Sequence, residues 1–216
     1  MEKENLKKLA QHLANPHGKE GIETGEMMHS TNIGMILESI NALLIEDDET
    51  ILEIGHGNAA HVKYIIDKAR SVRYTGIDIS ETMHLEAKRL NQEYQHQADF
   101  VWYEGEKLPF ADKTFDKIVT VNTVYFWENP VEYLDEIYRV MKDNGTFVLT
   151  FGQRDFMEKL PFTQFGFTLY NTDEMEETVS GSLFKRMKIS DREEQVKSKT
   201  EDQTIHRIYT ILTIKK

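Results

Sequence analysis

Cysteine is absent from this 216-residue chain, and no apolar run approaches the roughly 20 residues that a helix needs to cross a bilayer. Disulfides, thiolate zinc sites and a cysteine nucleophile are therefore excluded, in agreement with a reducing compartment. The first residues, MEKENLKKLA, also lack the apolar stretch of a signal peptide. We expect a cytoplasmic protein that does not interact with a membrane.

Basic residues are also in short supply, with 26 Lys and Arg against 37 Asp and Glu and a formal net charge of -11. An acidic protein gains nothing from the release of phosphate counterions, so neither nucleic acid nor anionic lipid is an expected partner. Hydrophobic residues make up 39% of the chain and charged residues 29%, which is ordinary globular usage and excludes wholesale disorder. The length favours one domain.

From residue 50 onward, short apolar runs bounded by turn residues alternate with amphipathic segments. Such runs are typical of strands buried on both faces, and the alternation predicts helical crossovers between parallel strands. We expect an α/β fold, a Rossmann-like doubly wound sheet that is mostly parallel. The predicted strands are TILEIG (50–55), YTGIDI (74–79), DFVWYEG (99–105), FDKIVTVNTVYF (115–126) and TFVLTFG (146–152). The predicted helices are NIGMILESINALL (32–44), HVKYIIDKAR (61–70), SETMHLEAKRLNQEY (80–94), capped by Ser80, and NPVEYLDEIYRVMKD (129–143), which Asn144-Gly145 should end.

The two ends of the chain are expected to flank this unit. Residues 1–34 are polar and contain several glycines, which predicts an N-terminal arm with a short helix before a single domain over 35–216. Residues 152–185, rich in phenylalanine, should form an insertion on the substrate side, with a helix over TDEMEETVSG. The β-rich segments EEQVKSK and IHRIYTILTI predict a C-terminal antiparallel hairpin at the sheet edge.

A glycine turn lies between the first predicted strand and its crossover helix. Gly55 allows a tight turn, and Gly57 lets the backbone lie close to a ligand. Asp78 ends the second strand, where a carboxylate can accept both hydroxyls of a ribose. Together they predict a nucleotide-like ligand at the carboxyl ends of the strands.

Two kinds of nucleotide fit this pattern. Gly55-x-Gly57-x-x-Ala60 also satisfies the dinucleotide fingerprint, and Tyr138-x-x-x-Lys142 mimics the tyrosine–lysine pair of short-chain dehydrogenases. The strand before that pair has no catalytic serine, and the surrounding apolar residues have core spacing, which favours a packed helix. A nicotinamide-dependent oxidoreductase remains the alternative.

Four motifs in order resemble a known family. Glu53-x-Gly55-x-Gly57, Asp78, the sequence Leu108-Pro109-Phe110 followed by Phe115-Asp116, and the helix–Asn144-Gly145–strand ending resemble class I S-adenosylmethionine-dependent methyltransferases over roughly residues 35–151. The chain looks most similar to the small-molecule branch that includes ubiquinone- and menaquinone-biosynthesis enzymes. The resemblance implies methyl transfer from S-adenosylmethionine to a small molecule. A catalytically silent protein that only binds this cofactor is a second alternative.

The resemblance also implies how the cofactor is held. Gly55 and Gly57 would pass beneath its methionine part, Glu53 would orient that part, and Asp78 would bind the ribose, with Ile79 packed on the adenine. Glu104 and Gly105 would face the adenine amino group, and Asn122 and Thr123 would lie beside the sulfonium. Two departures from the usual pattern are Glu104, where aspartate is common, and Ala59, which replaces a third glycine.

The acceptor side should include Tyr125, Phe126 and Trp127 after the fourth strand, although plain core packing explains this cluster equally well. The N-terminal arm should fold over the cofactor as a lid, contributing Met28, His29 and Asn32, so deletion of residues 1–30 should weaken cofactor binding. Tyr125 and His29 are the catalytic candidates. His56 is expected either to bind the cofactor carboxylate or to be a half-exposed loop histidine. No histidines have metal-ligand spacing, so we expect no metal site. The sequence predicts neither the acceptor atom nor the oligomeric state.

Overall fold

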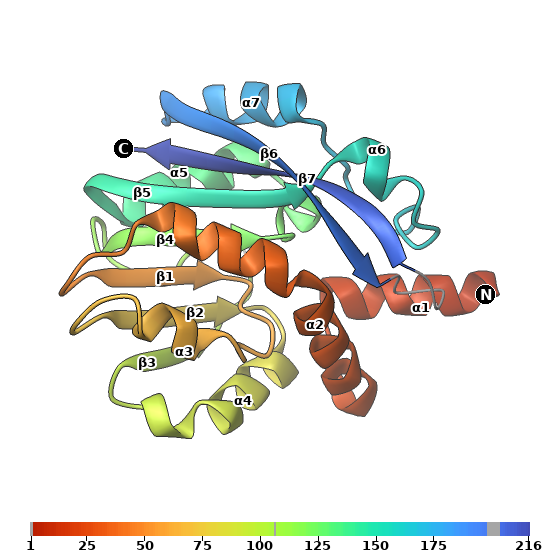
Figure 1. Ribbon diagram of the computed structural model, residues 1–216, viewed down its shortest axis with the longest axis horizontal. Coiled ribbons are helices and arrows are strands. Elements are labelled where there is room, and N and C mark those ends of the chain that lie inside the picture. The colour runs from red at the N-terminus through yellow and green to blue at the C-terminus, as the bar shows by residue number, and fades with distance from the viewer. Residues whose placement is uncertain (1, 106, 198–203) are drawn as a thin grey trace.

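The computed structural model describes residues 2–105, 107–197 and 204–216. Its strands form one seven-stranded sheet (Figure 1). The order is β3-β2-β1-β4-β5-β7-β6, with parallel pairing from β3 through β5 and antiparallel pairing of β7 with both β5 and β6. This confirms the Rossmann-like fold and the C-terminal hairpin. The strands are β1 (Thr50–Ile54), β2 (Arg73–Asp78), β3 (Ala98–Trp102), β4 (Phe115–Val121), β5 (Met141–Gly152), β6 (Arg186–Lys197) and β7 (Thr204–Lys215).

Helices cover both faces of the sheet, as Figure 1 shows. One apolar cluster joins the sheet to α2 (Gly18–Leu43), α3 (Val62–Ile66) and α4 (Glu81–Leu90), and another joins the opposite face to α5 (Pro130–Val140) and α7 (Thr172–Ser180). The remaining helices are α1 (Lys3–Ala14) and α6 (Arg154–Met157), with 3-10 turns at Gln92–Tyr94 and Val124–Phe126.

The apolar run of β1 is buried on both sides, as its sequence predicts. Ile51 belongs to the cluster under α2, whereas Leu52 and Ile54 belong to the cluster under α5, and all three are at most 2% exposed. Burying each such side chain contributes about 1.5–3 kcal/mol. This burial favours a central position for β1 in the sheet. The glycine turn follows the carboxyl end of β1 and therefore lies near the middle of the molecule.

The N-terminal segment differs from its predicted form. Helix α2 begins at Gly18 instead of residue 32, so the expected boundary between residues 34 and 35 lies within a continuous helix. Glycine disfavours helix, but at position 25 it permits close packing: a Cβ there would lie 2.6 Å from Sδ of Met83. Tertiary packing against α4 thus outweighs the local propensity that predicts an irregular arm.

Several predicted boundaries also shift. Helix α3 has only five residues, and β4 ends at Val121 because Asn122 adopts a left-handed φ of 60°. Helix α5 ends at Val140, and Asn144-Gly145 lies inside β5, where Asn144 has a φ of 66° and the register with β4 shifts. Strand β6 begins earlier than EEQVKSK, whose residues 198 and 199 lie outside the described residues. Ser80 does cap α4, accepting a hydrogen bond from the Met83 amide at 3.0 Å.

Candidate functional site

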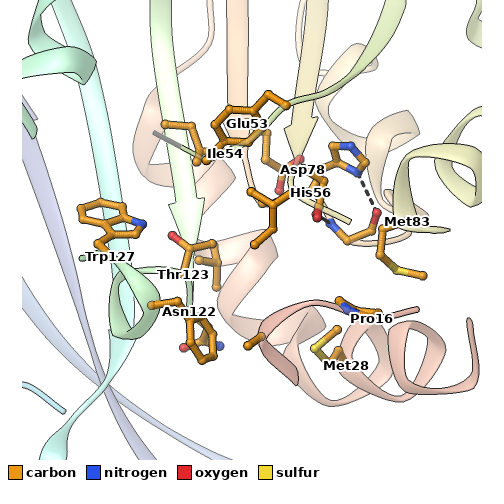
Figure 2. A pocket seen from close by; sticks show the side chains of 18 of the residues that line it. Pro16, Met28, Glu53, Ile54, His56, Asp78, Met83, Asn122, Thr123 and Trp127 are labelled. Carbon is orange, nitrogen blue, oxygen red and sulfur yellow. Dashed lines mark hydrogen bonds between the residues drawn. The ribbon is translucent and has the colours of Figure 1, made fainter. Parts of the chain in front are cut away.

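A cavity of about 870 Å³ lies at the carboxyl ends of the central strands. Figure 2 shows Glu53, His56 and Asp78 on one side and Asn122, Thr123 and Trp127 on another. Pro16, from the connection between α1 and α2, and Met28, from α2, face them. The structure brings together ten of the eleven predicted site residues in this cavity: His29, Glu53, Gly55, Gly57, Asp78, Ile79, Glu104, Gly105, Asn122 and Thr123. The eleventh, Tyr125, lines a smaller neighbouring cavity.

The glycine turn is held tightly against the sheet. The Gly55 amide donates to the carbonyl of Ile77 at 2.8 Å, and Gly55 has a φ of 75°. A Cβ on Gly55 would lie 2.4 Å from Cγ2 of Thr123, so this position needs glycine for its conformation and for its space. Ala59 has a φ of 53°, which explains why glycine would suit this place and shows that alanine keeps the same turn at some cost in strain.

Asp78 links the glycine turn to the helix that follows β2. Its Oδ2 accepts a hydrogen bond from the Gly57 amide at 2.9 Å, and its Oδ1 accepts one from the Ser80 amide at 2.8 Å. An ionised carboxylate has about four acceptor positions, so two remain for a ligand. Burial raises the pKa of Asp78 above its ordinary value of 3.8, although the nearby His56 and the two amides oppose that rise.

The carboxylate of Glu53 lies in a buried polar cluster that the sequence did not reveal. Nε2 of His61 lies 2.8 Å from Oε2 of Glu53, and the hydroxyl of Tyr74 donates to the same oxygen at 2.6 Å. Burial alone would raise the pKa of Glu53, but the charge of His61 and the hydrogen bonds from His61 and Tyr74 outweigh it and lower that pKa. Glu53 is therefore held as a carboxylate in the cavity wall.

His56 is buried, so the expectation of a half-exposed loop histidine is wrong. Its Nδ1 lies 2.6 Å from the carbonyl oxygen of Gly57, the contact dashed in Figure 2, and its ring packs edge-on against Phe100. Among the described residues its Nε2 has no hydrogen-bond partner. Burial lowers the pKa of His56, which favours the neutral ring.

The end of β4 forms a second polar corner of the cavity. The Tyr125 hydroxyl donates to Oδ1 of Asn122 at 3.0 Å and accepts from the Gly152 amide at 2.6 Å. Burial raises the pKa of Tyr125 far above its ordinary value, so the phenol stays protonated. These contacts hold Asn122 in its left-handed conformation, and Asn tolerates that region better than most residues.

Phe126 and Trp127, expected on the acceptor side, line the main cavity, whereas its lining residue Tyr133 carried no usable signal in the sequence. Trp127 and Tyr133 lie with ring centroids 4.8 Å apart beside the main cavity, and the hydroxyl of Tyr133 meets that of Tyr103 at 2.7 Å. Burial raises the pKa of Tyr103 to about 12. Tyr133 comes from α5, far along the chain from the glycine turn, so only the fold brings it to the site.

A smaller cavity of about 60 Å³ adjoins the main one and shares part of its wall. Apolar side chains of the segment 152–170 line it: Phe156, Met157, Leu160, Phe162 and Phe167. The residues common to both cavities are Leu13, Met28, Asn32, Asn122 and Phe126.

Over the described ranges 2–105, 107–197 and 204–216, no group of His, Asp and Glu is arranged to hold a metal ion. In the same ranges no helix combines the length and the apolarity that a membrane span requires.

The tyrosine–lysine pair that favoured a dehydrogenase lies away from the main cavity. Lys142 binds Asp116 at 2.7 Å, and the Tyr138 ring packs against Phe184 with centroids 5.2 Å apart. Neither residue of the pair lines the cavity. Tyr138 packs within α5, as the core spacing indicated, whereas Lys142 lies beyond the end of that helix in β5 and forms a surface ion pair.

Comparison with known proteins agrees with this geometry. Residues 52–149 match the family described as a methyltransferase domain. The chain is 27% identical to the uncharacterized methyltransferase YdaC of Bacillus subtilis over 132 residues, 61% of this chain and 71% of that protein. It is 29% identical over 105 residues to a fatty-acid O-methyltransferase of Mycolicibacterium smegmatis, covering 48% of this chain and 37% of that protein. The fold matches Haemonchus contortus phosphoethanolamine N-methyltransferase 2, bound to S-adenosylhomocysteine, with a TM-score of 0.71 and 15% identity over 96% of this chain and 60% of that one.

The glycine turn and the acidic end of β2 thus belong to a methyltransferase domain. The domain over residues 52–149 is that of a class I S-adenosylmethionine-dependent methyltransferase, and the cofactor is S-adenosylmethionine. Membership of the ubiquinone- and menaquinone-type branch stays a prediction.

Proposed function

We propose that the protein transfers the methyl group of S-adenosylmethionine to a small-molecule acceptor by in-line displacement. The observation that carries the proposal is the meeting of the two cavities at Asn122, beside the glycine turn. A displacement of this kind needs the nucleophile, the methyl carbon and the sulfur in line, and it needs water to be excluded. A cofactor cavity that shares wall residues with a smaller apolar cavity supports such an arrangement.

The residues present fit the cofactor at each position that the sequence assigned. Asp78 keeps two acceptor positions for the ribose hydroxyls, and Gly55 and Gly57 leave the turn without side chains beneath the methionine part. A Cβ on Gly105 would lie 3.2 Å from Cγ2 of Ile79, which agrees with a narrow slot for the adenine. Glu53 would orient the methionine end. Glu104 is exposed at the rim, where its carboxylate can reach an adenine amino group.

The acceptor side calls for positioning more than for acid–base chemistry, because a sulfonium is already a strong electrophile. A base is needed only if the acceptor must lose a proton during attack. His29 lines the main cavity, and burial followed by the neighbouring His61 lowers its pKa, so the ring is neutral and able to accept a proton. The buried hydroxyl of Tyr125, engaged with Asn122 and Gly152, suits a positioning role.

Small molecules are the acceptors named for two of the similar proteins, the fatty-acid O-methyltransferase and the phosphoethanolamine N-methyltransferase. The net charge of -11 makes a nucleic acid an unfavourable acceptor. These facts support a small organic acceptor for this chain as well.

Calorimetric titration with S-adenosylhomocysteine and, separately, with NADH tests the cofactor assignment. We expect S-adenosylhomocysteine alone to bind. Incubation with S-adenosylmethionine and a panel of small acceptors should then release S-adenosylhomocysteine. Binding of NADH instead would support the oxidoreductase, and binding of S-adenosylhomocysteine without turnover of any acceptor would support a silent cofactor-binding protein.

A further inference from the structure

The smaller cavity, which we call the acceptor chamber, is placed to receive part of the acceptor. It is lined by the described residues Leu13, Met28, Thr31, Asn32, Asn122, Tyr125, Phe126, Gly152, Phe156, Met157, Leu160, Phe162, Phe167, Val196, Ile205 and Arg207. Asn122 belongs to its wall and to the wall of the main cavity, at the position proposed for the sulfonium. A molecule in the chamber can therefore place one end near Asn122, where the methyl group is proposed to lie.

The walls of the chamber are apolar and closely packed. Phe167 packs against Phe126 with ring centroids 4.7 Å apart and against Phe162 with centroids 5.8 Å apart. Met28 and Leu160 complete this side. A volume of about 60 Å³ holds about four to six water-sized groups, given about 10–15 Å³ for each. The chamber thus has room for a short alkyl chain or one small ring.

Arg207 is the charged side chain among the described residues that line the chamber, and its charge is already neutralised. Its Nη2 donates to Oε1 of Glu194 at 2.7 Å and to the carbonyl of Thr31 at 2.9 Å, and its Nη1 donates to Oδ1 of Asn32 at 2.8 Å. The residue is only 5% exposed. Because Glu194 pairs with the guanidinium, the chamber carries no net charge for an acceptor to complement.

An ionic group would consequently be unfavourable in the chamber. An anion would have to compete with Glu194 for Arg207, and a cation would face a guanidinium of like charge. Either ion would lose its hydration to walls that offer few hydrogen bonds. An uncharged apolar group loses little and gains the burial of its own surface.

We propose that the acceptor is a neutral molecule whose alkyl or aryl end fills this chamber, with its nucleophilic atom at the mouth beside Asn122. The Glu194–Arg207 pair then acts as a specificity determinant, because it cancels the charge that would select a carboxylate. This inference rests on the proposed methyl transfer and adds the chemical class of the acceptor.

Three thiols with six carbons each test the proposal: 1-hexanethiol, 6-mercaptohexanoate and 6-amino-1-hexanethiol. Each is titrated at neutral pH into the full chain saturated with S-adenosylhomocysteine. We expect the Kd for 1-hexanethiol to be at least ten times lower than for either charged thiol. A charged thiol that binds as tightly, or no binding of 1-hexanethiol, would overturn the proposal.

Two variants sharpen the test. Glu194→Gln should leave Arg207 unneutralised and lower the Kd for 6-mercaptohexanoate at least tenfold, whereas an unchanged preference would contradict the role of the pair. Leu160→Trp should fill the chamber and abolish binding of 1-hexanethiol while S-adenosylhomocysteine still binds. Leu183→Trp, at an exposed position outside both cavities, is the matched control and should bind both ligands normally.

The two proposals fail in different ways. If the wild-type protein does not bind S-adenosylhomocysteine, the proposed methyl transfer is wrong. If S-adenosylhomocysteine binds but the charged thiols bind more tightly than 1-hexanethiol, only the proposal of a neutral acceptor is wrong.

Discussion

The carboxylate of Glu53 and the imidazole of His61 form a buried pair, with Nε2 of His61 2.8 Å from Oε2 of Glu53. Their side chains are 4% and 2% exposed, and the Tyr74 hydroxyl donates to the same carboxylate. The pair links the carboxyl end of β1 to the start of α3 across the glycine turn. It stabilises the very loop on which cofactor binding depends.

Replacing His61 with alanine should destabilise the protein, because the buried Glu53 carboxylate would keep only Tyr74 as a partner. Removing the partner of a buried carboxylate costs about 3 kcal/mol. Chemical denaturation at neutral pH measures the loss. His206→Ala is the matched control: His206 pairs with Glu193 at the surface, where such a pair is worth less than about 1 kcal/mol. If both variants lost the same free energy of unfolding, the buried pair would contribute no more stability than the surface pair.

The same substitution should change acid stability. In the wild type the pKa of Glu53 is lowered below 4.5, so the stability that this group contributes is present above that value and is lost as the pH falls through the lowered pKa. Without His61, burial raises the pKa of Glu53, and acid unfolding should begin at a higher pH. An unaltered acid midpoint would contradict this account.

Asp78→Asn should weaken binding of S-adenosylhomocysteine by about 1.5–3 kcal/mol, the value of a hydrogen bond to a charged group. Because burial raises the pKa of Asp78 above 3.8, wild-type affinity should fall on acidification at a higher pH than an ordinary aspartate would produce. The variant should lose this part of the pH dependence. Asp67→Asn, at an exposed position on α3's carboxyl end, serves as the control and should bind as the wild type does.

Gly55→Ala should lower the free energy of unfolding by about 2 kcal/mol or more, because left-handed backbone and overlap with Thr123 act together. Gly57→Ala is the matched control, since a Cβ there meets nothing within 4 Å and only its φ of 57° is strained. Adding Thr123→Ser to Gly55→Ala removes the overlapping methyl and should restore about 1 kcal/mol. If the double variant did not regain stability, the strain in Gly55→Ala would not come from overlap with the Thr123 methyl group.

Tyr125→Phe should lower the rate of methyl transfer roughly tenfold while the Kd of S-adenosylhomocysteine changes little, because Asn122 and the Gly152 amide lose a shared partner. The shape of the pH–rate profile between pH 7 and 10 should stay the same, since the buried phenol does not ionise there. Measuring kcat across this range separates positioning from proton transfer.

His29→Gln provides the contrast with Tyr125→Phe. If His29 accepts a proton from the acceptor, the wild-type rate falls as the pH drops through the lowered pKa of His29, where the ring becomes charged, and the variant loses that acid limb. If instead the wild-type pH–rate profile had an alkaline limb that disappeared in Tyr125→Phe, Tyr125 would be the residue that takes part in proton transfer, and His29 would have the positioning role.

Deletion of residues 1–15 should raise the Kd of S-adenosylhomocysteine if the N-terminal segment covers the cofactor as a lid. The deletion leaves α2 whole but removes Leu13 and Ala14 from the cavity wall. Circular dichroism should show that the sheet remains folded. Unchanged affinity in the shortened chain would reject the lid.

Local patterns in the sequence predicted the parts of the site that depend on backbone form. The period of apolar residues placed β1 and β2, and turn chemistry placed Gly55 and Gly57 at the carboxyl end of β1. Because parallel strands end at one edge, Asp78 had to arrive beside that turn. These features need only near neighbours along the chain, and they were enough to predict the fold class and a nucleotide-like ligand, whereas the choice of S-adenosylmethionine came from the family resemblance.

Only the tertiary structure determined which distant side chains complete the site. The register of β1 with β2 places Glu53 opposite Gly76, where the missing side chain leaves room for the Tyr74 hydroxyl to reach the carboxylate. The contact between Arg207 and Asn32 joins residues 175 positions apart. The full length of α2 likewise depends on packing against α4. Such contacts depend on how whole elements pack, and no short stretch of sequence encodes that packing.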